Sequence, residues 1–308
     1  MVDPVTQSPD REHRVGLLLG AAAWTMWGLF PVYFALLDSV SPIEIVAHRV
    51  IWSLLFMVIV ITVVRGWRRV RSHLSWRTVG ILAAAAVLLS VNWLVYVYAV
   101  NSDQVVQASL GYFINPLVSV ALGVVILHER MRRMQWLAIG IAAIAVLILT
   151  ISYGSLPWIA LILALSFGFY GLLKKFAGIG SAESLTIETA LLAPFALILL
   201  TTMEIDGGAI FATEGWGISI LLILLGPVTA LPLLAFGAAA NRIPLSTLGA
   251  LQYLTPILQF LLGVLVFAEP MPGTRWLGFV FVWIALVVFA TDTYRSTRQA
   301  RLAVNSFE

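Results

Sequence analysis

The sequence contains no cysteine and few charged residues, and each shortage excludes a class of protein. Without cysteine, the 308-residue chain can form neither a disulfide framework nor a cysteine metal site. Only 11% of its residues are charged, whereas soluble domains average roughly 25%. The four histidines, His13, His48, His73 and His128, lack the spacing of metal ligands. We therefore expect no metal, no cofactor and no enzymatic activity.

Long apolar runs stand where charges are scarce. The chain is 61% hydrophobic, and its mean hydropathy is +0.99. Runs of about 20 residues recur, each long enough to cross ~30 Å of hydrocarbon as a helix, and none alternates like a barrel strand. We predict an all-α integral membrane protein with ten transmembrane helices, at residues 15–36, 44–63, 78–100, 105–127, 134–151, 157–176, 184–203, 216–238, 245–267 and 275–291.

The basic residues predict the orientation of these spans. With a cytoplasmic N-terminus, 16 of the 18 Lys and Arg residues fall in cytoplasmic segments, as the positive-inside rule requires. Only Arg275 falls in an outer loop, and Arg49 falls within a span. Both termini are therefore predicted to be cytoplasmic. The net charge of +3 then reflects topology, and we expect no nucleic-acid partner.

An internal repeat relates the two halves of the chain at an offset of 140 residues. The matched pairs include Asn101 with Asn241, Pro116 with Pro256, Glu129 with Glu269 and Trp136 with Trp276. A repeat of five spans is odd, so its second copy must enter the membrane from the opposite side. Inverted repeats are typical of secondary transporters, although a scaffold without transport is an alternative. We place the repeats at 15–151 and 157–291, between tails at 1–14 and 292–308.

A proline stands at the centre of two apolar runs, in ASLGYFINP (108–116) and TLGALQYLTP (247–256). Pro116 and Pro256 are each the twelfth residue of a 23-residue span. A helical proline has no amide donor and displaces the carbonyl four residues earlier, and a freed carbonyl in hydrocarbon must face protein or a wet cavity. We predict two bent helices beside a central cavity between the repeats. Packing kinks are the alternative.

Six motifs run through most of the chain: AHRVIWS (47–53), NWLVYVYAVN (92–101), ASLGYFINPLV (108–118), HERMRRMQWLA (128–138), GSLPWIALILALSFGFYGL (154–172) and LSTLGALQYLTP (245–256). Together they resemble the drug/metabolite transporter superfamily, in particular its EamA-type transporters. The resemblance implies ten helices in two EamA repeats, an inner-membrane location and export of small molecules.

Transport by alternating access gives the chain its expected partners, a small-molecule solute and the lipid bilayer. A homo-oligomer is left open. A lipid scramblase or a non-transporting scaffold of the same fold is the alternative function. No filter-like loop or ring of charges indicates a channel.

Polar and aromatic residues within the spans form the candidate substrate site. Aromatic walls with a few polar groups suit an amphipathic solute, although packing and interface anchoring explain many membrane aromatics. The candidates are Trp24, Trp27, Asn92, Trp93, Tyr96, Gly111, Tyr112, Asn115, Tyr170, Gln252, Tyr253 and Thr255.

Three ionisable residues, His48, Arg49 and Glu188, lie within spans, where a charge usually faces a cavity or a partner. His48 aligns with Glu188 at the repeat offset, which makes both candidates for proton coupling. Helix-end contacts are the alternative, and Glu44 is a ready partner for His48 one turn away. Arg49 is either structural or a clamp for an anionic group on the substrate.

Overall fold

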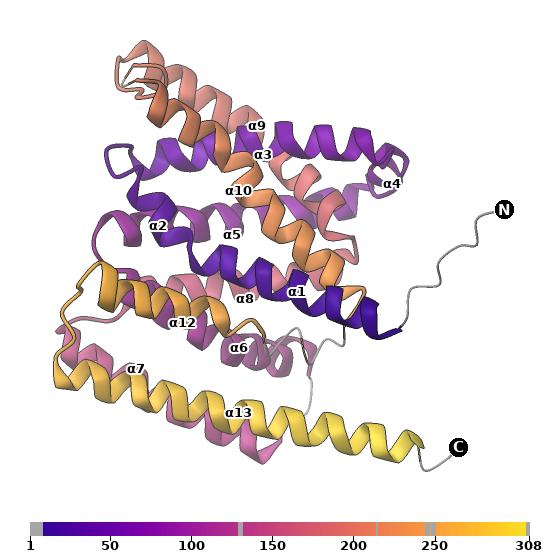
Figure 1. The fold of residues 1–308 in the computed structure, drawn as a ribbon, viewed down its shortest axis with the longest axis vertical. Helices are drawn as coiled ribbons and strands as arrows, with labels where there is room; N and C mark the ends of the chain where they lie inside the picture. The colour runs from indigo at the N-terminus through magenta and orange to yellow at the C-terminus, as the bar shows by residue number, and fades with distance from the viewer. Residues whose placement is uncertain (1–8, 129–131, 214, 244–246, 248–250, 306–308) are drawn as a thin grey trace. The chain divides into compact units, whose positions relative to one another are not determined.

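The computed structural model describes residues 9–128, 132–213, 215–243, 247 and 251–305, and all of its regular elements there are helical (Figure 1). They are α1 (Pro9–Gly28), α2 (Phe30–Ala35), α3 (Pro42–Val63), α4 (Trp67–Ser72), α5 (Trp76–Asn101), α6 (Val105–Leu127), α7 (Arg133–Tyr153), α8 (Trp158–Ala177), α9 (Ser181–Ile205), α10 (Trp216–Ala240), α12 (Leu254–Leu261), the π-helix η1 (Leu262–Val266) and α13 (Gly273–Asn305).

Nine helical segments of the described chain are long and apolar enough to cross a membrane. Together with a shorter apolar helix at Leu254–Val266, they confirm the prediction of a helical multi-pass membrane protein. The count of ten spans and the side of the termini stay predictions.

The chain forms two compact units. Unit 1 comprises Met1–Tyr33, Leu37–Ala83 and Gly178–Thr255. Unit 2 comprises Phe34–Leu36, Ala84–Ala177 and Pro256–Glu308. Each unit therefore combines segments from both halves of the sequence.

In unit 1, α3 packs against α9 and α10, and α10 also packs against α1. Ser41 caps the first turn of α3, where its hydroxyl accepts the Glu44 amide at 3.2 Å. Near the other end, an ion pair joins Arg69, on α4, to Glu183, in the first turn of α9. The start of α3 contacts the segment after α9, through Glu44 and Ile210. The two helices therefore run antiparallel.

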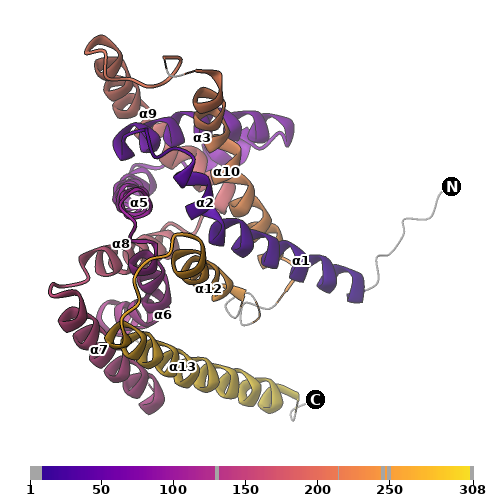
Figure 2. The ribbon, with the colours of Figure 1, turned by 60° about the vertical axis from the view of Figure 1, so that its left-hand side comes forward.

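In unit 2, α7 and α13 lie side by side in both views (Figures 1 and 2). The Arg275 guanidinium, near the start of α13, lies 4.2 Å from the centroid of the Tyr153 ring, at the end of α7. Arg132, just before α7, donates to Asp292 on α13 at 2.6 Å. These contacts show that α7 and α13 run antiparallel.

The second major pair in unit 2 is α6 with α8. Gly111 lets these helices approach closely, because a Cβ at this position would lie 2.8 Å from the Ala160 carbonyl oxygen. A glycine likewise allows α10 to approach α3 closely in unit 1, where a Cβ at Gly226 would collide with the Trp52 backbone. Small residues at such crossings are common in membrane bundles.

The ninth predicted span, 245–267, differs from the structure. Gln252 and Tyr253 form a turn, and α12 begins only at Leu254. Pro256 therefore lies in the first turn of a short helix rather than at the centre of a long one. A first-turn proline costs little, because the amide it lacks would have had no partner within the helix. Positions 245, 246 and 248–250 of this span lie outside the described residues.

Two other predicted spans also differ from the structure. The first predicted span, 15–36, is interrupted at Leu29, between α1 and α2, and Pro31 follows two residues later. The last helix, α13, continues to Asn305 and so extends through most of the predicted tail. Pro116, in contrast, lies inside the continuous helix α6, as predicted.

Candidate functional site: buried polar clusters in the two units

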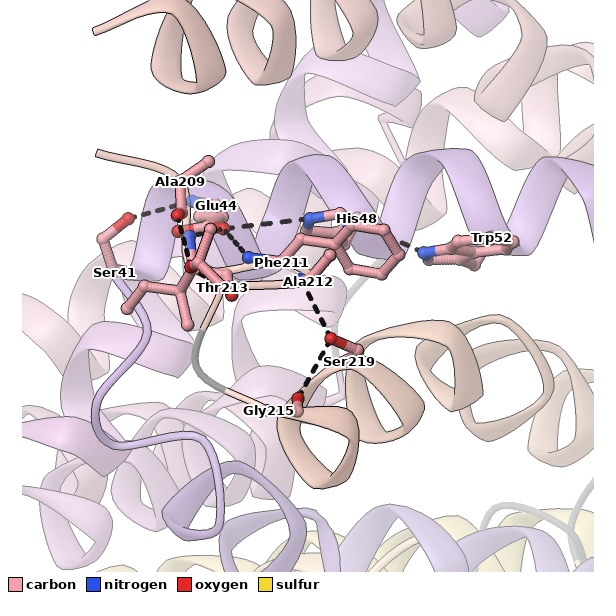
Figure 3. A network of polar contacts seen from close by, with 11 residues as sticks. Ser41, Glu44, His48, Trp52, Ala209, Phe211, Ala212, Thr213, Gly215 and Ser219 are labelled. Atoms are coloured by element: carbon pink, nitrogen blue, oxygen red, sulfur yellow. Dashed lines mark hydrogen bonds and ion pairs between the residues drawn. The ribbon is translucent and has the colours of Figure 1, made fainter. Parts of the chain in front are cut away.

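The Glu44 cluster of unit 1, comprising Ser41, Glu44, His48, Trp52 and Phe211, joins the start of α3 to the segment before α10 (Figure 3). The side chain of Glu44 is fully buried. Its Oε1 accepts the backbone amides of Ile210 at 2.8 Å and Phe211 at 3.3 Å. A buried carboxylate is stable only with such donors. Glu44 therefore ties two segments that are 166 residues apart in sequence.

His48, a predicted coupling residue, lies within this cluster. Its Nε2 is 3.9 Å from Glu44 Oε1, which confirms Glu44 as its helix-face partner. Trp52 Nε1 donates to His48 Nδ1 at 3.2 Å, so a neutral imidazole would carry its proton on Nε2, facing Glu44. The centroids of the Phe211 ring and the His48 imidazole lie 4.9 Å apart. His48 is thus held on two sides in a buried, mostly apolar setting.

The other two ionisable candidates are also buried in unit 1 and have polar contacts. Arg49 donates from Nε to the Thr229 hydroxyl at 2.8 Å, and its guanidinium lies 5.4 Å from the centroid of the Phe30 ring. Glu188, in α9, accepts the Ser184 hydroxyl at 2.6 Å. Their proposed roles as anion clamp and coupling residue stay predictions.

The Asn92 cluster of unit 2 comprises Asn92, Tyr96, Tyr112, Ser166 and Gln259, from α5, α6, α8 and α12. Asn92 donates to the Leu163 carbonyl at 3.1 Å and to the Ser166 hydroxyl at 3.0 Å. The Tyr112 hydroxyl donates to Asn92 Oδ1 at 3.5 Å. These hydrogen bonds therefore join three helices, α5, α6 and α8.

Aromatic contacts extend the cluster to a fourth helix. The rings of Tyr112 and Tyr96 meet edge to face at 5.7 Å between centroids. Gln259 on α12 donates to the Tyr96 hydroxyl at 3.0 Å. The Phe167 ring lies 6.4 Å from that of Tyr112. Three of the predicted substrate residues, Asn92, Tyr96 and Tyr112, are thus brought together.

Gln107 lies on the same helix as Tyr112 and ties α6 to α8. Its Oε1 accepts the amide of Ile159, in the first turn of α8, at 3.1 Å. One turn further along, Gly111 provides the close helix crossing described above. The substrate-binding role predicted for Gly111 is untested, and packing alone accounts for a glycine there.

Glu269 is a buried carboxylate in the loop between η1 and α13, with only 8% of its surface exposed. Its Oε1 accepts the amide of Val105 at 2.5 Å, and its Oε2 accepts that of Val106 at 3.1 Å. These are the first two residues of α6, whose amides have no partner within the helix. Glu269 therefore caps α6 from a loop more than 160 residues later in sequence.

The other aromatic candidates lie in separate surroundings. In unit 1, the rings of Trp24 and Trp27 pack on each other at 4.8 Å and on Phe236. The Thr255 hydroxyl donates to the Trp24 carbonyl at 2.7 Å. In unit 2, the rings of Tyr170 and Phe167 pack in a tilted arrangement, with their centroids 5.8 Å apart.

The remaining candidates lie on α5, on α6 and in the turn before α12. Trp93 is buried in α5, and Asn115 on α6 has a buried Oδ1 without a hydrogen-bond partner among the described residues. Gln252 and Tyr253 are half-buried in the turn before α12. The Gln252 carbonyl, predicted to be displaced by Pro256, accepts the Thr255 amide at 3.3 Å.

Sequence reasoning did not select Glu269, Gln259 or Ser166 as site residues. For Glu269 the repeat held a signal, because Glu129 matches it at the same offset in a chain with few acids. No comparable signal marks Gln259 or Ser166, whose importance comes from helices that meet only in the folded chain.

Comparison with known proteins identifies the family. Residues 14–151 match the EamA-like transporter family. The RarD protein of Streptomyces exfoliatus is 50% identical over 293 residues, which cover 95% of this chain and 93% of that protein. An uncharacterized transporter of Bacillus subtilis, YojE, is 42% identical over 296 residues, or 94% of this chain and 98% of the relative.

A protein of known crystal structure shares the fold, with a TM-score of 0.57 at 17% identity, over 91% of this chain and 98% of that one. The sequence relatives span nearly the whole chain and include proteins described as transporters. The chain therefore belongs to the EamA-like transporter family of the drug/metabolite transporter superfamily, among its RarD members.

Proposed function

We propose that the protein is a secondary transporter that exports a small amphipathic solute across the inner (plasma) membrane by alternating access. Its general role in transport follows from its family. The solute class, the direction and the mechanism are our proposals. The observation that carries them is the Asn92 cluster, a neutral polar junction of four otherwise apolar helices.

The chemistry of this cluster supports an uncharged or weakly polar solute. In a membrane interior, polar side chains cost free energy unless they are paired, so their concentration near the middle of α5 and α6 needs a reason. Hydroxyl and amide groups beside the Tyr96, Tyr112 and Phe167 rings can bind hydrogen-bonding groups and apolar faces of one solute.

The direction of the paired helices supports the proposed inverted repeats at 15–151 and 157–291. At the offset of 140 residues, α3 corresponds to α9, and α7, which begins at Arg133, corresponds to α13, which begins at Gly273. Both pairs pack together, and both run antiparallel. A duplication without inversion would produce parallel pairs. Inverted repeats are the usual basis of alternating access.

Proton coupling through His48 and Glu188 is part of the proposal, with uniport as its alternative. Both side chains are buried and hydrogen-bonded, and they stand at equivalent positions of the two repeats. A Glu188→Gln variant keeps the size of the side chain but cannot titrate. We expect it to retain solute exchange and to lose the response of transport to a pH gradient.

Solute flux into proteoliposomes tests the proposal. Growth of an overexpressing strain against amino acids, metabolites and antibiotics selects the solute to be measured. We expect saturable uptake that Asn92→Leu reduces at least about tenfold, since this change removes the hydrogen bonds of Asn92 with the Leu163 carbonyl, the Ser166 hydroxyl and the Tyr112 hydroxyl. Asn241→Leu, the same change at an exposed position, is the matched control.

Two results would contradict transport. Phospholipid redistribution without solute uptake would indicate a scramblase of the same fold. The absence of both activities in protein that is folded, as judged by cooperative thermal unfolding, would indicate a scaffold.

A further inference from the structure

The loop that carries Glu269, residues 267–272, is shaped to bring this carboxylate to the start of α6. It follows η1, a single π-helical turn of the kind often found at functional positions. Ala268 has a φ of 51°, in the left-handed region that residues with a Cβ rarely adopt. The Glu269 amide then donates to the Gly263 carbonyl at 2.9 Å, which closes the loop onto η1.

A glycine makes the approach to α6 possible. A Cβ at Gly263 would lie 2.7 Å from Val106 Cγ2, 3.1 Å from the Val106 amide nitrogen and 3.4 Å from Glu269 Oε1. There is consequently no room for a side chain between η1 and the first turn of α6. The carboxylate of Glu269 lies beside this close approach, and only 8% of the residue's surface is exposed.

Charged and titratable groups on the neighbouring elements act on this carboxylate in opposite directions. Asp103, in the loop before α6, opposes its ionisation, and Arg275, at the start of α13, favours it. The Arg275 guanidinium lies over the ring of Tyr153, the last residue of α7. Burial outweighs the Val105 and Val106 amides and Arg275, and it raises the pKa of Glu269 from 4.5 to about 7.

We propose that Glu269 is a proton-binding site at the outer end of unit 2, where a bound proton keeps the 267–272 loop on the start of α6. When the proton leaves, a carboxylate beside Asp103 is better hydrated than buried, and the loop contact opens. The site takes a proton from the outer face, which the charge pattern assigns to this loop. The ligand is a proton and no larger cation.

The direction of the effect follows from linkage. The pKa is higher in the closed arrangement than in water, so protonation stabilises that arrangement. The stabilisation is complete at low pH and is lost as the pH rises through about 7. The helix affected carries Tyr112 of the Asn92 cluster. The link to transport rests on the proposed function, whereas the proton site itself does not.

Hydrogen exchange at the Val105 and Val106 amides tests the proton site without transport. In purified full-length protein, and after correction for intrinsic exchange rates, their protection should fall by about tenfold between about pH 6 and about pH 8. Glu269→Gln, which resembles the protonated side chain, should stay protected across this range. Glu44→Gln is the matched control, since it alters a similar carboxylate–amide contact in unit 1 and should leave these two amides unchanged.

A second variant keeps the proposal falsifiable if Glu269→Gln does not fold. Asp103→Asn removes the opposing charge and should move the midpoint of the exchange transition to lower pH. Asparagine tolerates the left-handed conformation of residue 103, whose φ is 53°. Protection that does not change with pH in the natural protein, or a midpoint that Asp103→Asn leaves in place, would overturn the proposal.

Flux measurements separate this inference from the proposed function. If the exchange transition occurs and transport responds to pH in the natural protein but not in Glu269→Gln, the site couples protons to transport. If the exchange transition occurs while transport ignores pH, the proton site stands and proton-coupled transport is refuted.

Discussion

The two units use similar contacts to join helices that come from different halves of the sequence. In unit 1, Glu44 binds the amides of Ile210 and Phe211, and in unit 2, Glu269 binds those of Val105 and Val106. Each unit also has an ion pair between two segments that are far apart in sequence. In unit 1 it joins Arg69 to Glu183, and in unit 2 it joins Arg132 to Asp292. Each unit thus has a buried carboxylate and a surface ion pair that join its segments.

The difference between the carboxylates lies in their surroundings. Glu44 is fully buried, and its Oε1 lies 3.9 Å from the Nε2 atom of His48. Glu269 is slightly exposed and faces the like charge of Asp103 as well as Arg275. The two carboxylates therefore make similar contacts in different charge environments, and the proton dependence that we propose concerns the contact in unit 2.

The largest expected effect comes from removing the Glu44 contact of unit 1. Glu44→Leu leaves the amides of Ile210 and Phe211 without their acceptor, and should lower the free energy of unfolding by about 2–4 kcal/mol. Glu269→Leu should cost about 1–2 kcal/mol, because water can reach the start of α6 once the loop opens. Thermal unfolding in detergent at neutral pH measures both.

Glu44→Gln is the control for this pair, because glutamine keeps an oxygen that can accept both amides. It should retain most of the stability that Glu44→Leu loses. Equal losses for Glu44→Leu and Glu269→Leu would remove the contrast between the units.

Close helix crossings give the next largest effect. Gly226→Ala and Gly111→Ala should each destabilise the protein by about 1–3 kcal/mol, since the added methyl group meets backbone atoms of the facing helix. Gly140→Ala, at an open helical position, is the control and should change little. Unfolding midpoints measure the three variants. Unaltered stability of Gly226→Ala would show that α10 and α3 separate easily.

The surface ion pairs should contribute least. Arg69→Gln and Arg132→Gln should each change stability by about 0–1 kcal/mol, because the arginine side chains are 65% and 42% exposed. The loss should shrink further at high salt. A loss of stability above about 2 kcal/mol for either variant would mean that the ion pair stabilises its unit as strongly as a buried carboxylate does.

The sequence predicted the helices well where apolar length alone defines them. The predicted span 105–127 coincides with α6, and most others agree within a few residues. It failed around Pro256, because a proline inside a membrane helix and a proline in the first turn of a helix leave the same apolar pattern. Only the turn at Gln252 and Tyr253 distinguishes them.

Contacts of the candidate site could be predicted from the sequence where both residues lie on the same helix. Glu44 and His48 are one turn apart, so their contact was foreseen. The contact of Glu269 with α6 and that of Gln259 with Tyr96 join segments more than 160 residues apart. No local pattern encodes such pairs, and hydropathy treats these residues only as interruptions of an apolar run.

Access to Asn115 from both sides of the membrane tests alternating access most directly. The chain has no cysteine, so Asn115→Cys introduces a unique thiol on α6, and Ala138→Cys, fully buried in α7, is a control that should not react. A small aqueous thiol reagent should label residue 115 from the outside in one part of the transport cycle and from the cytoplasm in another, with solute shifting the balance. Labelling from one side only under all conditions, or from neither side, would contradict the account.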